Sequence, residues 1–271
     1  MSEVIEVSSE WLALREPEDA RARSRELARA AADRLGPGPI AVHDLGSGTG
    51  SMMRWLAPLL PGPQTWVLHD WNPGLVERAA DGGVPVDRDG RPVRVAIRSE
   101  ELSHLEPGDL EGASLVTASA LLDVLTLDEI RAIARACVAV GCPALLSLSV
   151  TGRVHLGPAD ARDDLFAAAF NAHQQRRVDG RALAGPSAVA DARRLFVEAG
   201  WNAREETTFW RLGRHDPDLL AQWFDGWLGA AVEQRADFEV PAAAYRALRA
   251  SHLRQGVLTA TVVHTDLLVW P

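Results

Sequence analysis

The sequence predicts an α/β protein built on a doubly wound, mostly parallel sheet. Between residues 40 and 150, short apolar runs of strand length alternate with segments of helical periodicity, which is the pattern of consecutive βαβ units. The first of these runs ends in a glycine-rich turn, and such sheets bind ligands at the carboxyl ends of their strands. The chain has 271 residues, enough for one domain with insertions, so we expect a single domain over 1–271.

Composition and charge narrow the class of function. The chain is 47% hydrophobic and 24% charged, as ordinary soluble globular proteins are. Its formal net charge of -9 argues against nucleic acid as a partner and favours a small-molecule substrate. Cys137 and Cys142 have neither metal nor disulfide-framework spacing, so no metal site is expected. Residues 1–6 lack the features of a signal peptide and no run is long enough for a membrane helix, so we expect a cytoplasmic protein without membrane contact.

Residues 1–37 are expected to form an N-terminal helical cap. Within it the sequence predicts a helix over 17–35. Pro17 suits the first helical position, acidic residues follow in the first turn, and Gly36 ends the helix.

The run 40–45 predicts a buried strand, and the turn 46–50 predicts a binding site. Glycines allow a sharp turn and let a ligand approach without meeting a Cβ atom. The N–H groups that open the following helix then face the ligand. A dinucleotide-binding fingerprint would place its third glycine one position later, where Ser51 stands, and would not carry an acid at position 44.

A second strand, 65–69, is followed directly by Asp70. This acid lies about 20 residues beyond the last glycine of the turn, as adjacent parallel strands require. A carboxylate accepts two hydrogen bonds from a vicinal diol, so Asp70 suits the ribose of a nucleoside.

The stretch Asp44-Leu45-Gly46-Ser47-Gly48-Thr49-Gly50, together with Asp70, resembles the nucleotide-binding motif of class I S-adenosylmethionine-dependent methyltransferases. The resemblance implies a Rossmann-like methyltransferase fold with a seven-stranded sheet whose last strand is antiparallel, and it makes 38–150 the cofactor-binding half. It further implies that the loop residues contact the methionine part of the cofactor, that Asp44 orients the loop and the amino group, and that Asp70 holds the ribose hydroxyls. These loop residues are Gly46, Ser47, Gly48 and Gly50.

The same resemblance suggests further cofactor contacts. Arg15 is a candidate for the methionine carboxylate, or else a solvated charge at a helix entry. Trp71 either lines the adenine with its flat apolar face or is an ordinary buried tryptophan at a strand end. Many relatives carry an Asp for the adenine amino group after the third strand, here 92–98. This chain has none there, so Ser99 and Glu100 are its substitutes.

The fourth strand, 113–119, ends at Ser119, which the resemblance places beneath the cofactor and facing the transferred methyl. Asp123 follows in the bend. It either orients a substrate amine or hydroxyl, or caps the helix that begins near Thr126. A helix over 127–140 and a fifth strand over 143–150 complete the alternating part.

Two insertions, 151–185 and 213–256, are expected on the substrate side. The first carries a helix over 160–177, and His173 lies on its apolar stripe. His173, and His155 in the preceding turn, are either substrate contacts or hydrogen-bonded structural residues. The rest predicts a helix, a strand, two helices and a last strand, at 187–200, 204–212, 217–232, 241–254 and 257–270. The aromatic residues of the second insertion wall an acceptor pocket, or else form a core or a homodimer face.

The expected function is methyl transfer from S-adenosylmethionine to an oxygen, nitrogen or carbon centre of a small molecule. Such in-line displacement depends mainly on proximity and orientation. His173 or His155 would serve as base for a hydroxyl or an acidic carbon, and Asp123 would position an amine. The alternatives are a nicotinamide-dependent oxidoreductase and a non-catalytic S-adenosylmethionine-binding protein.

Overall fold

The computed structural model describes residues 7–178 and 180–271, so residues 1–6, used above for the expected location, lie outside it. Its main feature is a seven-stranded sheet in the order β3-β2-β1-β4-β5-β9-β8. The strands are β1 (Ile40–Leu45), β2 (Gln64–His69), β3 (Arg94–Arg98), β4 (Leu115–Ser119), β5 (Ala144–Gly157), β8 (Asn202–Leu212) and β9 (Thr259–Trp270).

The first five strands are parallel, and β9 runs antiparallel to both β5 and β8. The predicted doubly wound, mostly parallel sheet with an antiparallel last strand is confirmed. The strand order reverses between β1 and β4, and ligands bind at this point in open α/β sheets.

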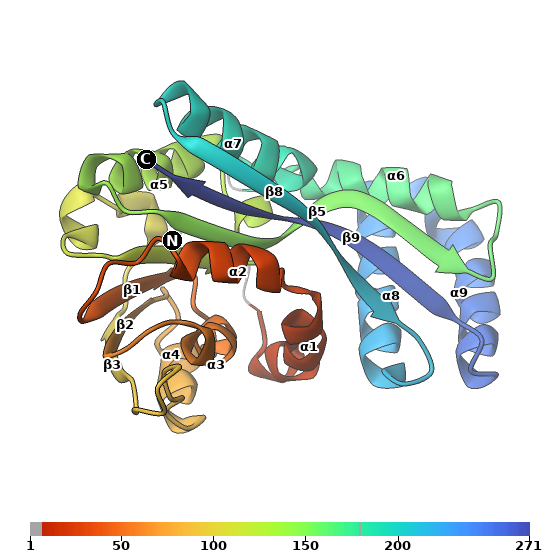
Figure 1. Ribbon diagram of the computed structural model, residues 1–271. Coiled ribbons are helices and arrows are strands. Elements are labelled where there is room, and N and C mark those ends of the chain that lie inside the picture. The colour runs from red at the N-terminus through yellow and green to blue at the C-terminus, as the bar shows by residue number, and fades with distance from the viewer. Residues whose placement is uncertain (1–6, 179) are drawn as a thin grey trace.

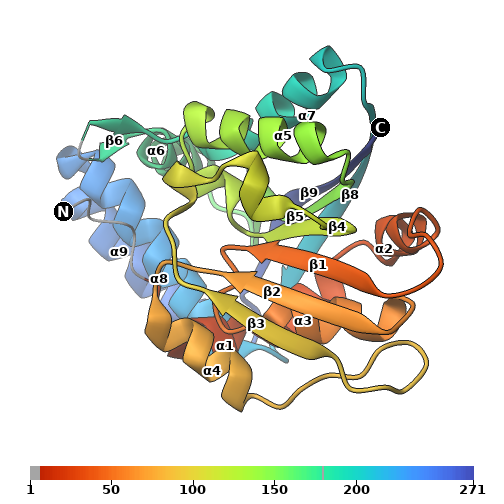
Figure 2. The same cartoon turned by 90° about the vertical axis from the view of Figure 1, so that its left-hand side faces the viewer.

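Helices cover both faces of the sheet (Figures 1 and 2). One face packs against α2 (Arg25–Ala32), α3 (Ser51–Leu56) and α4 (Pro73–Asp81) through a core that includes Val42, Trp66 and Leu68. The other packs against α5 (Leu127–Val140) and α7 (Ala188–Glu198). Alternate side chains of each buried strand supply the two cores, as the pleat requires.

A third core lies where β5, β8 and β9 extend beyond the other strands. Helices α6 (Asp163–Gln174), α8 (Pro217–Gln234) and α9 (Glu239–Arg254) surround these outer strand ends, away from β1 to β3 (Figure 1). Phe166, Trp227 and Tyr245 pack together there, with ring centroids 4.7 and 6.4 Å from Phe166. These rings therefore form a core that holds the inserted helices on the sheet.

The predicted N-terminal helix over 17–35 is wrong in its bounds. The structure has α1 (Ser9–Ala22), with Pro17 in its interior, and α2 begins after a break. Ser8 starts α1 by accepting a hydrogen bond from the Trp11 N–H at 3.2 Å. Ser24 separates the helices because its N–H donates to the Asp266 carboxylate and its hydroxyl caps α2.

The fifth strand is longer than predicted, since it runs to Gly157 rather than ending near residue 150. Its outer part pairs with β9 after two register shifts, one of them between Leu146 and Ser149. The segment 151–185 thus begins as strand, and its helix α6 covers 163–174 rather than 160–177. Pairing with β9, which is distant in the sequence, determines the length of β5. Local hydrophobic periodicity does not indicate such pairing.

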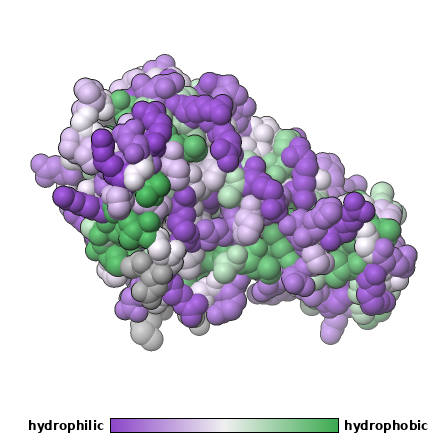
Figure 3. Space-filling model, turned by 60° about the horizontal axis from the view of Figure 1, so that its bottom comes forward, coloured by the Kyte–Doolittle hydropathy of each residue, from purple (hydrophilic) through white to green (hydrophobic). Residues whose placement is uncertain are grey.

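The hydrophilic surface is broken by smaller hydrophobic groups on the face shown in Figure 3. Within the described part, the helices lack the combined length and hydropathy needed to cross a bilayer.

Candidate active site

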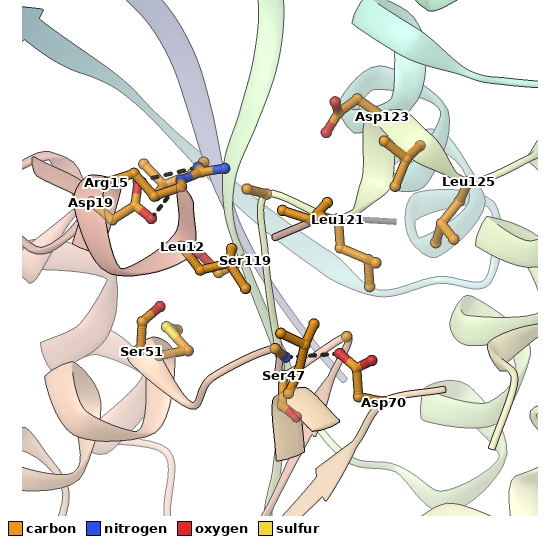
Figure 4. A pocket seen from close by; sticks show the side chains of 18 of the residues that line it. Leu12, Arg15, Asp19, Ser47, Ser51, Asp70, Ser119, Leu121, Asp123 and Leu125 are labelled. Atoms are coloured by element: carbon orange, nitrogen blue, oxygen red, sulfur yellow. Dashed lines mark hydrogen bonds and ion pairs between the residues drawn. The ribbon is translucent and has the colours of Figure 1, made fainter. Parts of the chain in front are cut away.

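A cavity of about 490 Å³ opens at the carboxyl ends of β1, β2 and β4, beneath α1. Figure 4 shows side chains from these separate segments facing one space. The residues predicted from the sequence that line it are Arg15, Asp44, Gly46, Ser47, Gly48, Asp70, Trp71, Glu100, Ser119 and Asp123. Gly50, Ser99, His155 and His173 are not among its lining residues.

The loop after β1 turns with positive φ at Gly46 (61°) and Gly48 (52°). A Cβ atom added to Gly46 would lie 2.7 Å from Leu121, and one added to Gly48 would lie 3.2 Å from Leu12. Only glycine fits this conformation and this space. The loop therefore presents bare backbone to the cavity.

Gly50 has a structural role instead. It starts α3 with φ 80°, and an added Cβ atom would lie 3.1 Å from the Cβ atom of Ala79. It thus lets α3 and α4 pack closely.

Asp70 ties the ends of β1 and β2 together. Its carboxylate accepts hydrogen bonds from the N–H groups of Gly48 at 2.8 Å and Asn72 at 2.9 Å. Burial raises the pKa of this carboxyl above its ordinary value. Each carboxylate oxygen still has a free lone pair, so Asp70 retains capacity for a ligand.

Asp44 is buried in the sheet next to the loop. One oxygen accepts a hydrogen bond from the Thr117 hydroxyl at 2.7 Å, and the other, Oδ2, has no partner among the described residues. Burial raises the pKa of Asp44 to about 7. A buried acceptor without a donor is costly, so this oxygen is suited to a donor group of a ligand.

We expect Asp44 to make stability fall as the pH rises from about 4 to 7. In that range the unfolded chain, whose Asp has its ordinary pKa, has lost the proton that the folded protein keeps. Asp44→Asn should remove this slope, which is at most about 1.4 kcal/mol per pH unit. Urea unfolding of both proteins at pH 5 and pH 7.5 measures it; an equal slope in both would contradict the expectation.

Arg23 is a site residue that the sequence analysis missed. It lies between α1 and α2, is 3% exposed, and donates to the hydroxyls of Ser119 at 3.0 Å and Ser51 at 2.9 Å. Burial lowers the pKa of its guanidinium, while Asp19, Asp44 and Asp266 raise it. It places a positive charge beside the glycine loop. No local pattern distinguishes it from the other arginines of a chain rich in them.

Arg15 reaches the cavity from α1 but is already paired. Its guanidinium donates to both oxygens of Asp19, at 2.9 and 3.1 Å (Figure 4). The guanidinium also lies 4.8 Å from the ring centroid of Trp210. The solvated charge considered above is thus an ion pair within the cavity wall.

Asp123 lies on a short 3₁₀ turn, η4 (Leu122–Val124), and its side chain faces the cavity (Figure 4). It does not cap α5: the Thr126 hydroxyl accepts from the Glu129 N–H at 3.2 Å, and the Glu129 carboxylate accepts from the Thr126 N–H. The capping interpretation is wrong because Thr126 and Glu129 form a capping box. Asp123 Oδ1 has no hydrogen-bond partner among the described residues.

The two histidines predicted as catalytic lie away from the cavity. His173 on α6 faces α8, with Nε2 3.1 Å from the Glu233 carboxylate and Nδ1 3.0 Å from Arg176. His155 is exposed on β5, opposite Thr261 of β9. The stripe containing His173 thus packs within the inserted helices.

Another histidine, His264, does line the cavity. It lies on β9, with its ring centroid 5.7 Å from that of Trp210. Burial lowers the pKa of His264 to about 3, so its ring is neutral at physiological pH. Its Nδ1 has no partner among the described residues.

The wall next to His264 is aromatic and apolar. It combines rings from α1, α6, β8 and α8 with strand residues of β5 and β9, namely Trp11, Phe170, Trp210, Trp223, Leu148, Val150 and Val262. We call this part of the cavity, together with Asp123 and His264, the aromatic half. The other part, at the glycine loop and Asp70, is the loop half.

Two non-glycine residues of the wall have left-handed backbone, Ala120 (φ 53°) and Leu148 (φ 56°). The buried Asp266 carboxylate holds the second by accepting from the Leu148 N–H at 2.7 Å, and it also accepts from Ser24 at 2.8 Å. Such strained conformations persist only where their surroundings impose them.

No family model and no curated protein matches this chain. Its fold is similar to that of solved structures. A cyclopropane-fatty-acyl-phospholipid synthase-like protein from Lactobacillus casei matches with a TM-score of 0.52 and 15% identity, over 96% of this chain and 92% of the other. A cyclopropane synthase from Mycobacterium tuberculosis matches with a TM-score of 0.51 and 12% identity, over 98% of this chain and 95% of the other. At these identities the likeness concerns the fold.

Proposed function

We propose that this protein is an S-adenosylmethionine-dependent methyltransferase that acts on a small-molecule acceptor. The observation that carries the proposal is the meeting of three features in one cavity: a glycine loop of bare backbone, the buried Asp44 beside it, and Asp70 at the end of the next strand. The fold shared with a cyclopropane synthase and a cyclopropane-fatty-acyl-phospholipid synthase-like protein supports it.

The loop half fits this cofactor chemically. An ammonium group would supply the donor that Asp44 Oδ2 lacks. The vicinal hydroxyls of a ribose match the remaining acceptor capacity of Asp70. Gly46 and Gly48 leave room where any side chain would meet Leu121 or Leu12.

Arg23 is our choice for the carboxylate of the methionine moiety. The hydroxyls of Ser51 and Ser119 hold its guanidinium next to the loop, whereas Arg15 is paired with Asp19 through Nε and Nη2. Arginine is suited to this because its fork matches a carboxylate. At the opposite end, Trp71 and Glu100 line the cavity beyond Asp70, where the adenine would lie.

When bound, S-adenosylmethionine supplies an electrophilic methyl group on a positively charged sulfur. The protein's own contribution is to align an acceptor with that group and to exclude water. In-line displacement gains most from such positioning. Side chains from both inserted segments, Phe170 and Arg181 from 151–185 and Trp223 from 213–256, line the cavity and would surround the acceptor.

Calorimetric titration with S-adenosylmethionine, S-adenosylhomocysteine and NADH tests the proposal. We expect the two adenosyl ligands to bind and NADH not to. Binding of NADH alone would instead favour a nicotinamide-dependent oxidoreductase. Cofactor binding without transfer to any acceptor tested would leave a binding protein as the better description.

His173→Gln is expected to leave both cofactor affinity and turnover unchanged. His173 contacts Glu233, whose side chain is 72% exposed, and Arg176, all outside the cavity lining. His173 itself is buried, but solvent at the exposed Glu233 carboxylate screens the pair, so we expect it to contribute less than about 1 kcal/mol to stability. Once an acceptor is known, initial rates of the two proteins provide the measurement. A large loss of turnover at unchanged stability would restore His173 as a catalytic residue.

A further inference from the structure

The aromatic half of the cavity carries one carboxyl group with a buried oxygen that has no hydrogen-bond partner among the described residues. Asp123 faces this space, and its Oδ1 is shielded from solvent without a hydrogen-bond partner. A buried carboxylate oxygen without a hydrogen-bond partner costs free energy unless a ligand supplies a donor or a positive charge. The residue therefore indicates that a ligand of this cavity carries a hydrogen-bond donor or a positive charge.

The arginines around Asp123 are already engaged. Arg15 donates to both oxygens of Asp19, and Arg181 donates to both oxygens of Glu129 at 2.8 Å. Arg15 is nonetheless near enough to lower the pKa of the Asp123 carboxyl, while burial raises it more strongly. Arg15 and Arg181 thus each form an ion pair with another carboxylate, and no ion pair joins Asp123 to an arginine among the described residues.

The remaining surroundings also favour a cation. Trp11, Phe170 and Trp223 line the cavity with aromatic rings, whose faces attract positive charge. His264 is neutral and adds hydrogen-bonding capacity without repelling a cation. The net charge of -9 would draw positively charged solutes toward the protein.

We propose that the acceptor is an organic amine with an apolar body, whose nitrogen is bound by Asp123 within the aromatic half. This inference rests on the proposed methyltransferase function and narrows its substrate class. The Asp123 carboxylate would repel a carboxylate or phosphate acceptor, and Arg15 and Arg181 already form ion pairs with Asp19 and Glu129. An alcohol would satisfy one hydrogen bond but would leave the charge of Asp123 unbalanced.

Asp123 would also receive the proton that an ammonium ion must lose before it reacts. The amine nitrogen then uses its freed lone pair to form the new N–C bond, while the C–S bond to the methyl group breaks and its electron pair remains on sulfur. The product leaves as a methylated ammonium ion, and Asp123 releases its proton to solvent. No oxidant, reductant or metal is required.

The test uses matched probes on the full-length protein saturated with S-adenosylhomocysteine. Calorimetry compares 2-phenylethylamine with 2-phenylethanol and 3-phenylpropionate, which share the apolar body and differ at the polar end. We expect the amine to bind at least about ten times more tightly than the alcohol or the acid, because only the amine forms a hydrogen bond between two charged groups with Asp123. Equal or tighter binding of the alcohol or the acid, or no binding of the amine, would overturn the proposal.

Asp123→Asn should weaken amine binding by about tenfold or more and leave the affinity for S-adenosylhomocysteine unchanged. The matched control is Asp128→Asn, which removes a carboxylate that is 89% exposed on the neighbouring helix. Unchanged amine affinity in Asp123→Asn, with normal thermal unfolding, would refute the role of Asp123. If wild-type protein fails to bind S-adenosylhomocysteine, the proposed function fails; if it binds but does not prefer the amine, only this inference fails.

Discussion

Asp266→Ala is expected to lower the free energy of unfolding by about 3 kcal/mol, because each buried donor left without an acceptor costs roughly 1 to 3 kcal/mol. The carboxylate of Asp266 is fully buried and accepts from the N–H groups of Leu148 and Ser24 and from the Thr208 hydroxyl. The substitution would leave these donors unpaired. It would also remove the hydrogen bonds that hold the left-handed backbone of Leu148 and the backbone of Ser24 between α1 and α2.

Urea unfolding of the wild type and of Asp266→Ala measures this effect. The free energy of unfolding of Asp266→Asn should lie between those of the wild type and Asp266→Ala. An amide keeps one acceptor oxygen, but its NH₂ group faces the second N–H group. Asp237→Ala is the matched control, because its carboxylate is 63% exposed and pairs only with the neighbouring Arg235. A change of less than about 1 kcal/mol in Asp266→Ala, the typical size for an exposed ion pair, would mean that water replaces the carboxylate.

Asp70→Ala is expected to weaken S-adenosylmethionine binding by about 1 to 3 kcal/mol, or roughly 5- to 150-fold, through loss of charged hydrogen bonds to the ribose. The same change removes the acceptor of the Gly48 and Asn72 N–H groups. The loop would then lose part of the constraint that prepares it for a ligand.

Calorimetric titration of the purified variant provides the measurement. Glu77→Ala, on the exposed side of the adjacent α4, is a suitable control and should bind normally. Asp70→Asn should bind with intermediate affinity, because it keeps one acceptor oxygen. Wild-type affinity in Asp70→Ala would place the cofactor elsewhere in the protein.

Local sequence was sufficient for the first half of the fold. The strand that leads into the glycine turn starts at residue 40 as predicted, and the helix 127–140 has the predicted bounds. Both have strong periodicity, and clear stop signals follow them in glycines 46 and 141. The loop residues and Asp70 were found because their spacing along the chain is short and chemically specific.

Spacing along the chain could not predict the surroundings of Asp123 or the position of Arg23. Arg23 meets Ser119, a residue 96 positions away, and Asp266 meets Ser24, 242 positions away. Each of these residues has an ordinary neighbourhood in the sequence. His173 was predicted on a stripe that does exist, yet the helix carrying it turns that side toward α8.

The sequence by itself therefore determined the alternating strands and helices of the first half, the glycine loop and the acid that follows the second strand, because these depend on patterns within short stretches of the chain. Only the tertiary structure decided which arginine faces the loop, which histidine lines the cavity, and that Asp123 Oδ1 has no hydrogen-bond partner within residues 7–178 and 180–271. The physical reason is that burial and pairing of charged groups depend on segments that meet only after folding.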